Sequence, residues 1–338
     1  MHTEIKPSIS PDDQFARNKT LESIFVPHAW RRRNEVSASA KTTSARFVHY
    51  TSAEAALKII NHKRLWMRNA AYMTDYREVQ HGFTILQRFF SVKEKAKTFV
   101  DAVNVFASGA ADEAINLFNQ WWSLGTIQFK TFIVSVSEHY SEEDFHGRLS
   151  MWRAFGAAIA RVGLVFNVPE RSKGAEAMKL IFSPVTYFKD NEAEQVVSEV
   201  IKNLMTHTDF LKTVGRQEII NWIFSMLLLG VTCVKHEGFR EEKEWRVVHC
   251  PKLYPSPLIT PSVEIVAGVP QTVYSLPLDK RVNPILDDID FAKLFDRLII
   301  GPSPYPMAMV DAYLEALSNA GIPEAGKKIF ISGIPIRS

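Results

Sequence analysis

Two long stretches of helical periodicity interrupt the short strand-like runs of this 338-residue chain. Apolar side chains recur at three- and four-residue spacing within residues 76–129, and residues 193–234 form a second helical block. The strand-like runs cover residues 46–50, 65–68, 131–137, 162–168, 244–249, 263–266, 298–300 and 328–332. Short strands separated by all-helical blocks favour a mixed α+β fold. We expect one α+β domain over residues 46–338 with two helical insertions, after a polar, partly ordered arm over residues 1–45.

The composition is that of an ordinary globular protein. Hydrophobic residues make up 46% of the chain and charged residues 23%, with a net charge of +3. This near balance gives no general argument for binding nucleic acid or a membrane. The most apolar stretch, residues 219–234, is shorter than the roughly 20 residues that span a bilayer. Because residues 1–13 also lack the pattern of a secretory signal, we expect a cytoplasmic protein without a membrane segment.

Several familiar site chemistries have no motif in this sequence. The two cysteines, Cys233 and Cys250, are too few for a disulfide framework or a cysteine-based zinc site. Histidines and carboxylates do not occur at metal-ligand spacings, and the chain has neither a Walker A loop nor a G-x-G-x-x-G loop. We therefore expect no bound metal and no phosphate loop of a common kind.

The most unusual polar segment is Phe-Arg-Glu-Glu-Lys-Glu-Trp-Arg-Val-Val, residues 239–248. If this segment is extended, Glu242, Glu244 and Arg246 point to the same face, because side chains alternate along a strand. Two like charges on one face repel unless a neighbouring cation or a ligand neutralises one of them. The alternative is a solvated edge strand whose charges deter aggregation.

Polar and aromatic groups also gather at the ends of other predicted elements. His49 and its neighbours end the first strand, Ser135 and Ser137 share one face of another, and Trp152 stands on a one-turn helix. The remaining candidates are Tyr50, Thr51, Tyr72 and Arg153. In the turn at residues 72–78, Asp75 and Glu78 are interpreted as a helix N-cap. No glycine-flanked elbow surrounds either serine, which disfavours a serine hydrolase.

Taken in order, these segments resemble a known bacterial family. His-Tyr-Thr at 49–51, Leu-Trp-Met-Arg-Asn at 65–69, Ser-x-Ser at 135–137, Trp-Arg-x-x-Gly at 152–156 and Glu-Glu-x-Glu-Trp-Arg at 241–246 carry the likeness. They are similar to the motifs of the domain of unknown function 2971 (DUF2971) family, over about residues 46–335. Thr74 and Phe155 stand where the family more often has asparagine and tyrosine.

The same order also resembles the NAD-binding core of ADP-ribosyltransferases. This likeness implies a mixed, split β-sheet core. It assigns cofactor contacts to His49 and Thr51 on the first strand and to Ser135 and Ser137 on the second. The final carboxylates would be catalytic; they are Glu242 and Glu244.

The implied reaction is cleavage of the nicotinamide–ribose bond of NAD, with NAD as a substrate. The transition state resembles an oxocarbenium ion, so a carboxylate beside it stabilises charge that develops only there. Glu244 would bind the ribose 2′-hydroxyl, and Glu242 would orient or deprotonate the acceptor, an unknown protein or nucleic acid. Stacking on nicotinamide is assigned to Tyr50, Tyr72 or Trp152, and pyrophosphate binding to Arg153 or Arg246.

A second hypothesis is a non-catalytic or nucleic-acid-associated binding module of a phage-defence or toxin system. Glu242 with Arg246, and Asp75 with Arg68, would then be structural ion pairs. The enzyme hypothesis requires His49, Ser135 and Glu244 to converge on one concave pocket. The binding-module hypothesis expects these side chains to be dispersed or buried in the core.

Overall fold

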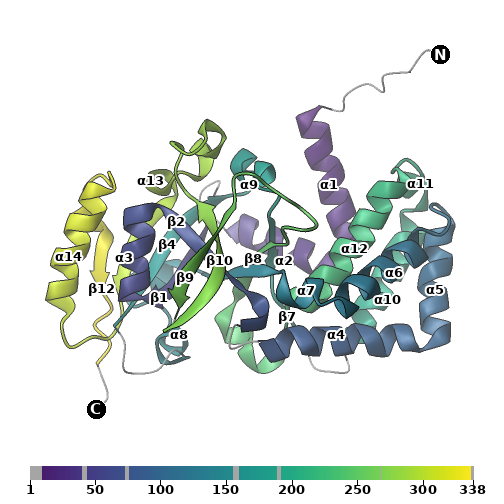
Figure 1. The fold of residues 1–338 in the computed structure, drawn as a ribbon, viewed down its shortest axis with the longest axis horizontal. Coiled ribbons are helices and arrows are strands. Elements are labelled where there is room, and N and C mark those ends of the chain that lie inside the picture. Colours follow the sequence, from purple (N-terminus) through teal and green to yellow (C-terminus); the bar gives the residue numbers. More distant parts are fainter. Residues whose placement is uncertain are drawn as a thin grey trace.

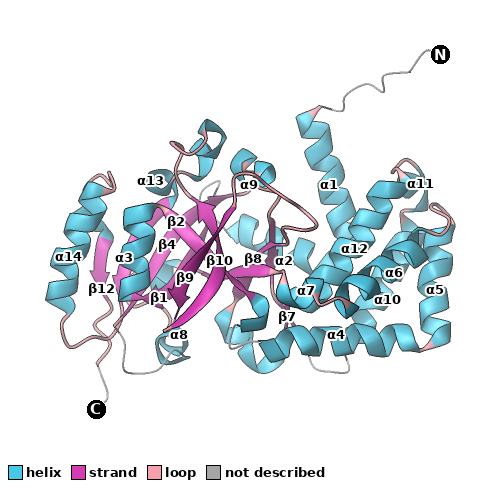
Figure 2. Ribbon diagram, viewed as in Figure 1, coloured by secondary structure: helices cyan, strands magenta, loops and turns pink. Residues whose placement is uncertain are grey.

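A ten-stranded mixed sheet forms one part of the molecule, and a bundle of helices forms the other (Figures 1 and 2). The computed structural model describes residues 10–39, 44–72, 76–154, 160–188, 192–266 and 268–335. The prediction of a single α+β domain with a mixed sheet is confirmed.

The strands are short, as the sequence pattern predicts. They are β1 (Ser44–Ser52), β2 (Arg64–Asn69), β3 (Phe132–Glu138), β4 (Arg161–Pro169), β5 (Ile181–Pro184), β6 (Thr186–Phe188), β7 (Val234–His236), β8 (Glu244–His249), β9 (Thr260–Val266), β10 (Val269–Pro277), β11 (Phe295–Ile300) and β12 (Ile329–Ile331). The main sheet runs β12-β11-β4-β1-β3-β2-β10-β9, and β8 pairs with both β3 and β5. Parallel pairing of β11 with β12 makes this sheet mixed, and β6 and β7 form a separate parallel pair.

The sheet splits at β3. All of β8 pairs with β3, where its partners are residues 132–137. On the other edge of β3, β1 pairs with Ser137 and Glu138, whereas β2 pairs with Phe132 and Ile133. Because β1 and β2 share one edge, they separate beside the middle of β3, around Ser135.

Helices cover the sheet and build the second part. They are α1 (Pro11–Phe25), α2 (Pro27–Ser39), α3 (Ala53–His62), α4 (Tyr76–Ser91), α5 (Lys93–Asn104), α6 (Ala110–Ser123), α7 (Thr126–Phe129), α8 (Leu149–Ala154), α9 (Lys173–Ala177), α10 (Ala193–Thr206), α11 (Thr208–Lys212), α12 (Arg216–Thr232), α13 (Phe291–Leu294) and α14 (Pro306–Asn319). Helices α3, α13 and α14 pack their apolar faces on β2, β4, β10 and β11. Helices α4–α6 and α10–α12 share a second core with α1.

Helix α12 lies at the centre of the helical part, and α4 approaches it very closely. A Cβ atom at Gly82 would lie 2.6 Å from the Gly230 carbonyl oxygen and 2.8 Å from the Val231 Cα. Glycine at position 82 therefore lets the two helix backbones touch, which fixes their relative position.

The N-terminal region differs from the expected arm. Residues 11–39 form α1 and α2, which pack on the helical part and on the sheet. The arginine triplet pairs within the chain: Arg31 with Glu199, Arg32 with Glu138, and Arg33 with Glu22. Sequence periodicity gave no signal for this, because the partners lie far away in the chain or on another helix.

Candidate functional site

The three strands that carry the histidine, serine and glutamate motifs are neighbours. Strand β3 lies between β1 and β8, with Ser135 opposite Arg246 and Ser137 opposite Glu244. Directly opposed residues of an antiparallel pair point to the same face. Both serines therefore share a face with Glu244 and Arg246, beside the split of the sheet.

Glu244 is the centre of a carboxylate cluster, which we define as Ser135, Lys235, Glu242, Glu244 and Arg246. The Ser135 hydroxyl donates to Glu244 Oε1 at 2.5 Å, and Arg246 Nε donates to the same oxygen at 2.8 Å. Glu244 Oε2 accepts from Lys235 Nζ and from Arg246 Nη2, each at 3.2 Å. Lys235 Nζ also lies 2.7 Å from Glu242 Oε2.

The cluster keeps Glu244 ionised. Burial opposes ionisation, since Glu244 is only 5% exposed, but the charges of Arg246 and Lys235 outweigh it and lower the pKa of this carboxyl to about 2. Tyr187 contributes from β6, where its hydroxyl accepts the Glu244 backbone N–H at 2.8 Å. Burial raises the pKa of that tyrosine, so its hydroxyl stays protonated. Glu244 is thus a fixed negative charge at neutral pH.

Glu242 does not extend the strand, contrary to the sequence-based interpretation. It ends a 3₁₀ helix over Glu237–Glu242, and Lys243 follows with a positive φ of 45°. This turn breaks the alternation that would have placed Glu242 and Glu244 on one strand face. The two carboxylates meet instead through Lys235, which neutralises their repulsion.

His49 reaches the cluster only through the backbone of Ser135. Val48 is opposite Ser137 and shares its face, so His49, the next residue on β1, points to the other face. Its Nδ1 lies 2.9 Å from the Ser135 carbonyl oxygen. Burial lowers the pKa of His49 and keeps the imidazole neutral. Thr51, two residues on, shares the face of His49.

Apart from Arg246, the aromatic and arginine candidates are not gathered around Glu244. Tyr50 and Trp152 pack edge to face at 4.7 Å in a buried cluster of their own. Tyr72 and Arg153 are exposed. Arg246 is buried, and besides Glu244 it binds the Thr232 carbonyl at 2.6 Å. The assigned roles of these side chains in NAD binding stay predictions.

Residues 151–247 match the model of the family described as "Protein of unknown function (DUF2971)". Over this segment the chain is similar to the DUF2971 family. No curated protein and no solved structure matches the chain. The DUF2971 segment runs from α8 to β8, so it contains Lys235, Glu242, Glu244 and Arg246, whereas His49 and Ser135 precede it.

Arg148, which the sequence gave no reason to select, stands just before the DUF2971 segment and holds it to the sheet. Its guanidinium donates to the carbonyl oxygens of Glu138, Glu241 and Glu242 at 2.8, 3.1 and 2.7 Å. It also binds the Glu143 carboxylate at 2.8 Å, and it is only 6% exposed. Arg148 therefore fixes the turn that leads into β8 and Glu244.

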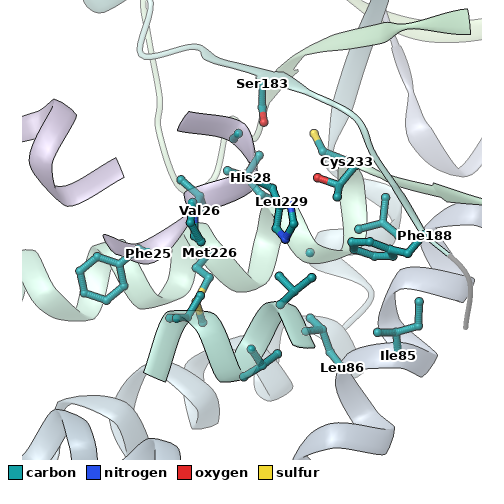
Figure 3. A pocket seen from close by; sticks show the side chains of 18 of the residues that line it. Phe25, Val26, His28, Ile85, Leu86, Ser183, Phe188, Met226, Leu229 and Cys233 are labelled. Carbon is teal, nitrogen blue, oxygen red and sulfur yellow. The ribbon is translucent and has the colours of Figure 1, made fainter. Parts of the chain in front are cut away.

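A mostly apolar cavity of about 100 Å³ lies beyond the cluster, at the bend between α1 and α2 (Figure 3). His28 enters it from α2, and Ser183 and Cys233 border it on the sheet side. Ser183 is opposite Arg246 on β5 and β8 and shares its face, so the cavity borders the face of β8 that carries the cluster. None of the residues predicted for the site lines this cavity.

Some predictions concern residues outside the described part of the chain. Asp75, Phe155 and Gly156 are among them, and the side chain of Glu78 is not described either. Within the described ranges, no group of three or more histidine, cysteine or acidic side chains could hold a metal ion. None of the helices described is long and apolar enough to cross a membrane.

Proposed function

We propose that this protein is an NAD-consuming, ADP-ribosyltransferase-like enzyme that cleaves the nicotinamide–ribose bond with Glu244 as its central carboxylate. One observation carries the proposal: the histidine, serine and glutamate motifs meet on adjacent strands. The continuous chain of contacts from His49 Nδ1 to the Ser135 carbonyl, and from the Ser135 hydroxyl to Glu244 Oε1, supports it. The split of the sheet beside Ser135 supports a core of the ADP-ribosyltransferase type.

The electrostatics of Glu244 suit this chemistry. Departure of nicotinamide takes both electrons of the C1′–N1 bond and leaves positive charge on the ribose, which a fixed carboxylate stabilises. An acceptor hydroxyl, or water, then forms the new bond to C1′ and gives its proton to a base, the role proposed for Glu242. Ser135 is half-buried and the Glu242 side chain is 22% exposed, so these two members provide the access to Glu244.

A second candidate function, the non-catalytic binding module, rests on two observations: the cluster is buried, and His49 points to the opposite face from Ser135 and Glu244. Lys235, Glu244 and Arg246 are 3%, 5% and 3% exposed, and both cations pair with the carboxylate. An ion cluster of this kind can serve the fold alone. Its function would then lie on another surface of the molecule.

An assay of nicotinamide release from NAD by the purified protein distinguishes the enzyme from the binding module. The assay is run with and without added cell lysate, which can supply an acceptor. The enzyme proposal expects nicotinamide release by the wild type and loss of release in Glu244→Gln. Glu241→Gln is the matched control. Glu241 lies three residues before Glu244 and its side chain is exposed, so this variant should keep full activity.

Ser135→Ala gives a second variant that leaves every charge of the cluster in place. We expect it to fold normally and to lower the release rate, because the hydroxyl that positions Glu244 Oε1 is gone. Circular dichroism of each variant confirms that the protein is folded. Release that persists in folded Glu244→Gln refutes the role of Glu244, and no release by the wild type, even with lysate, favours the binding module.

A further inference from the structure

A groove in the helical part has the features of a small-molecule site. It lies between α4 and α6, with α12 beneath them, and encloses about 390 Å³. Sites for small ligands typically measure roughly 300–1,000 Å³ and combine apolar walls with a few convergent polar groups. The residues that line the groove are Phe83, Leu86, Gln87, Phe90, Ser91, Ile115, Phe118, Asn119, Trp122, Ser123 and Leu227.

The walls of the groove are aromatic and uncharged. Phe83 and Trp122 stack in parallel, with ring centroids 3.7 Å apart and an angle of 2° between the planes. Phe90 and Phe118 add two further rings from the facing helices. None of the residues that line the groove carries a charge, so nothing in its wall favours a phosphate, a carboxylate or a cation. Phe83 and Trp122 cover one face of each other, so a flat, neutral ring would stack on an outer face of this pair.

Polar groups reach the rim from both helices at the spacing of one helical turn. Gln87 and Ser91 lie four residues apart on α4, and Asn119 and Ser123 lie four residues apart on α6, so each pair shares a helix face. All four are exposed. Within the described part of the chain, neither side-chain amide has a hydrogen-bond partner. Two amides are thus available to a ligand.

We propose that this groove binds an adenine-type base. Carboxamides of asparagine and glutamine pair with the N6 and N7 edge of adenine, and aromatic side chains stack on the face of a base. The base could come from a free nucleoside or from an unpaired stretch of a nucleic acid, since both present the same ring and edge. This inference is independent of the activity proposed for Glu244.

The cavity in Figure 3 does not offer this chemistry. It is smaller, about 100 Å³, and two of its polar side chains, Ser183 and His28, already have partners within the chain. The Ser183 hydroxyl donates to the Pro184 carbonyl, and His28 lies between Arg31 and Glu199. Of these two hollows, the groove between α4 and α6 is therefore the better site for a ligand with hydrogen-bonding edges.

Calorimetric titration of the full chain with adenosine and with single-stranded oligoadenylate tests the proposal. Asn119→Leu and Gln87→Leu remove the amides without adding charge. Their matched controls are Asn116→Leu on α6 and Gln80→Leu on α4, two exposed positions that do not line the groove. We expect the groove variants to weaken binding about tenfold or more, the effect of losing one paired base edge, and the controls to leave it unchanged.

The oligonucleotide arm separates the two sources of the base. Tighter binding of oligoadenylate than of adenosine, with affinity that falls as salt increases, indicates a base presented by a strand. Equal affinity indicates a free nucleoside, and both results require the groove variants to bind less well. The proposal is overturned if neither probe saturates, if an abasic strand binds as well as oligoadenylate, or if groove and control variants behave alike. Binding should persist in Glu244→Gln whether or not that variant retains NAD turnover.

Discussion

The carboxylate cluster and the groove between α4 and α6 use polar side chains in opposite ways. In the cluster, Glu244 is 5% exposed and accepts hydrogen bonds from Ser135, Lys235 and Arg246. In the groove, Gln87 and Asn119 stand at an exposed rim beside stacked rings. Polar groups that the chain itself satisfies contribute to stability, whereas those left to solvent can exchange water for a ligand at little cost to the fold. The two regions should therefore respond differently to substitution.

Arg148→Ala should cause the largest loss of unfolding free energy, because it removes the side chain that supports the cluster. Three backbone carbonyls and the Glu143 carboxylate would lose their buried donor. Loss of one partner from a buried charged network costs about 3–5 kcal/mol. Urea unfolding of the variant should show this loss.

Arg153→Ala is the control, since Arg153 is exposed on α8 only five residues away. It should change the free energy of unfolding by less than about 0.5 kcal/mol. Equal stability of Arg148→Ala and wild type would show that the turn before β8 is held by its other contacts.

A smaller loss of unfolding free energy should appear when acid protonates Glu244. Its pKa is about 2 in the folded protein, against 4.5 for the ordinary side chain, so the unfolded chain takes up the proton first as pH falls. The stabilisation is complete above about pH 4.5 and is lost as the pH falls toward 2. The shift corresponds to about 3 kcal/mol, at about 1.4 kcal/mol per pKa unit.

The difference in unfolding free energy between wild type and Glu244→Gln isolates this contribution from the other acids. We expect that difference to be constant above pH 5 and to shrink between pH 4.5 and pH 2. A difference that does not change with pH would mean that Glu244 titrates normally in the folded protein and that its ion pairs contribute little.

The sequence predicted elements whose signal is local. The strand-like run at 131–137 appears as β3 at Phe132–Glu138, and the run at 162–168 appears as β4 at Arg161–Pro169. Side-chain alternation along an extended run is also local, which is why Glu244 and Arg246 could be placed on one face. The interpretation failed at Glu242, where a single left-handed residue, Lys243, ends the strand pattern.

Long-range partners could not be predicted in this way. Arg148 binds carbonyl oxygens, which carry no sequence signature, and its partner Glu242 is 94 residues away in the chain. The groove depends on how α4 and α6 cross α12, and the close approach of α4 to α12 requires the contact of Gly82 with Gly230. A single sequence does not show that an arginine or a glycine has such a role.

The smallest effect on stability should come from the groove. Asn119 is exposed and has no hydrogen-bond partner in the described part of the chain, so Asn119→Leu leaves no buried group unsatisfied. Leucine is also a good helix former. We expect the free energy of unfolding to change by less than about 0.5 kcal/mol, measured by urea unfolding beside Asn116→Leu. A loss of 2 kcal/mol or more in Asn119→Leu alone would mean that the amide supports the packing of α6 on α4. The contrast between a cluster of polar groups that pair with one another and a groove whose amides face solvent would then fail at that residue.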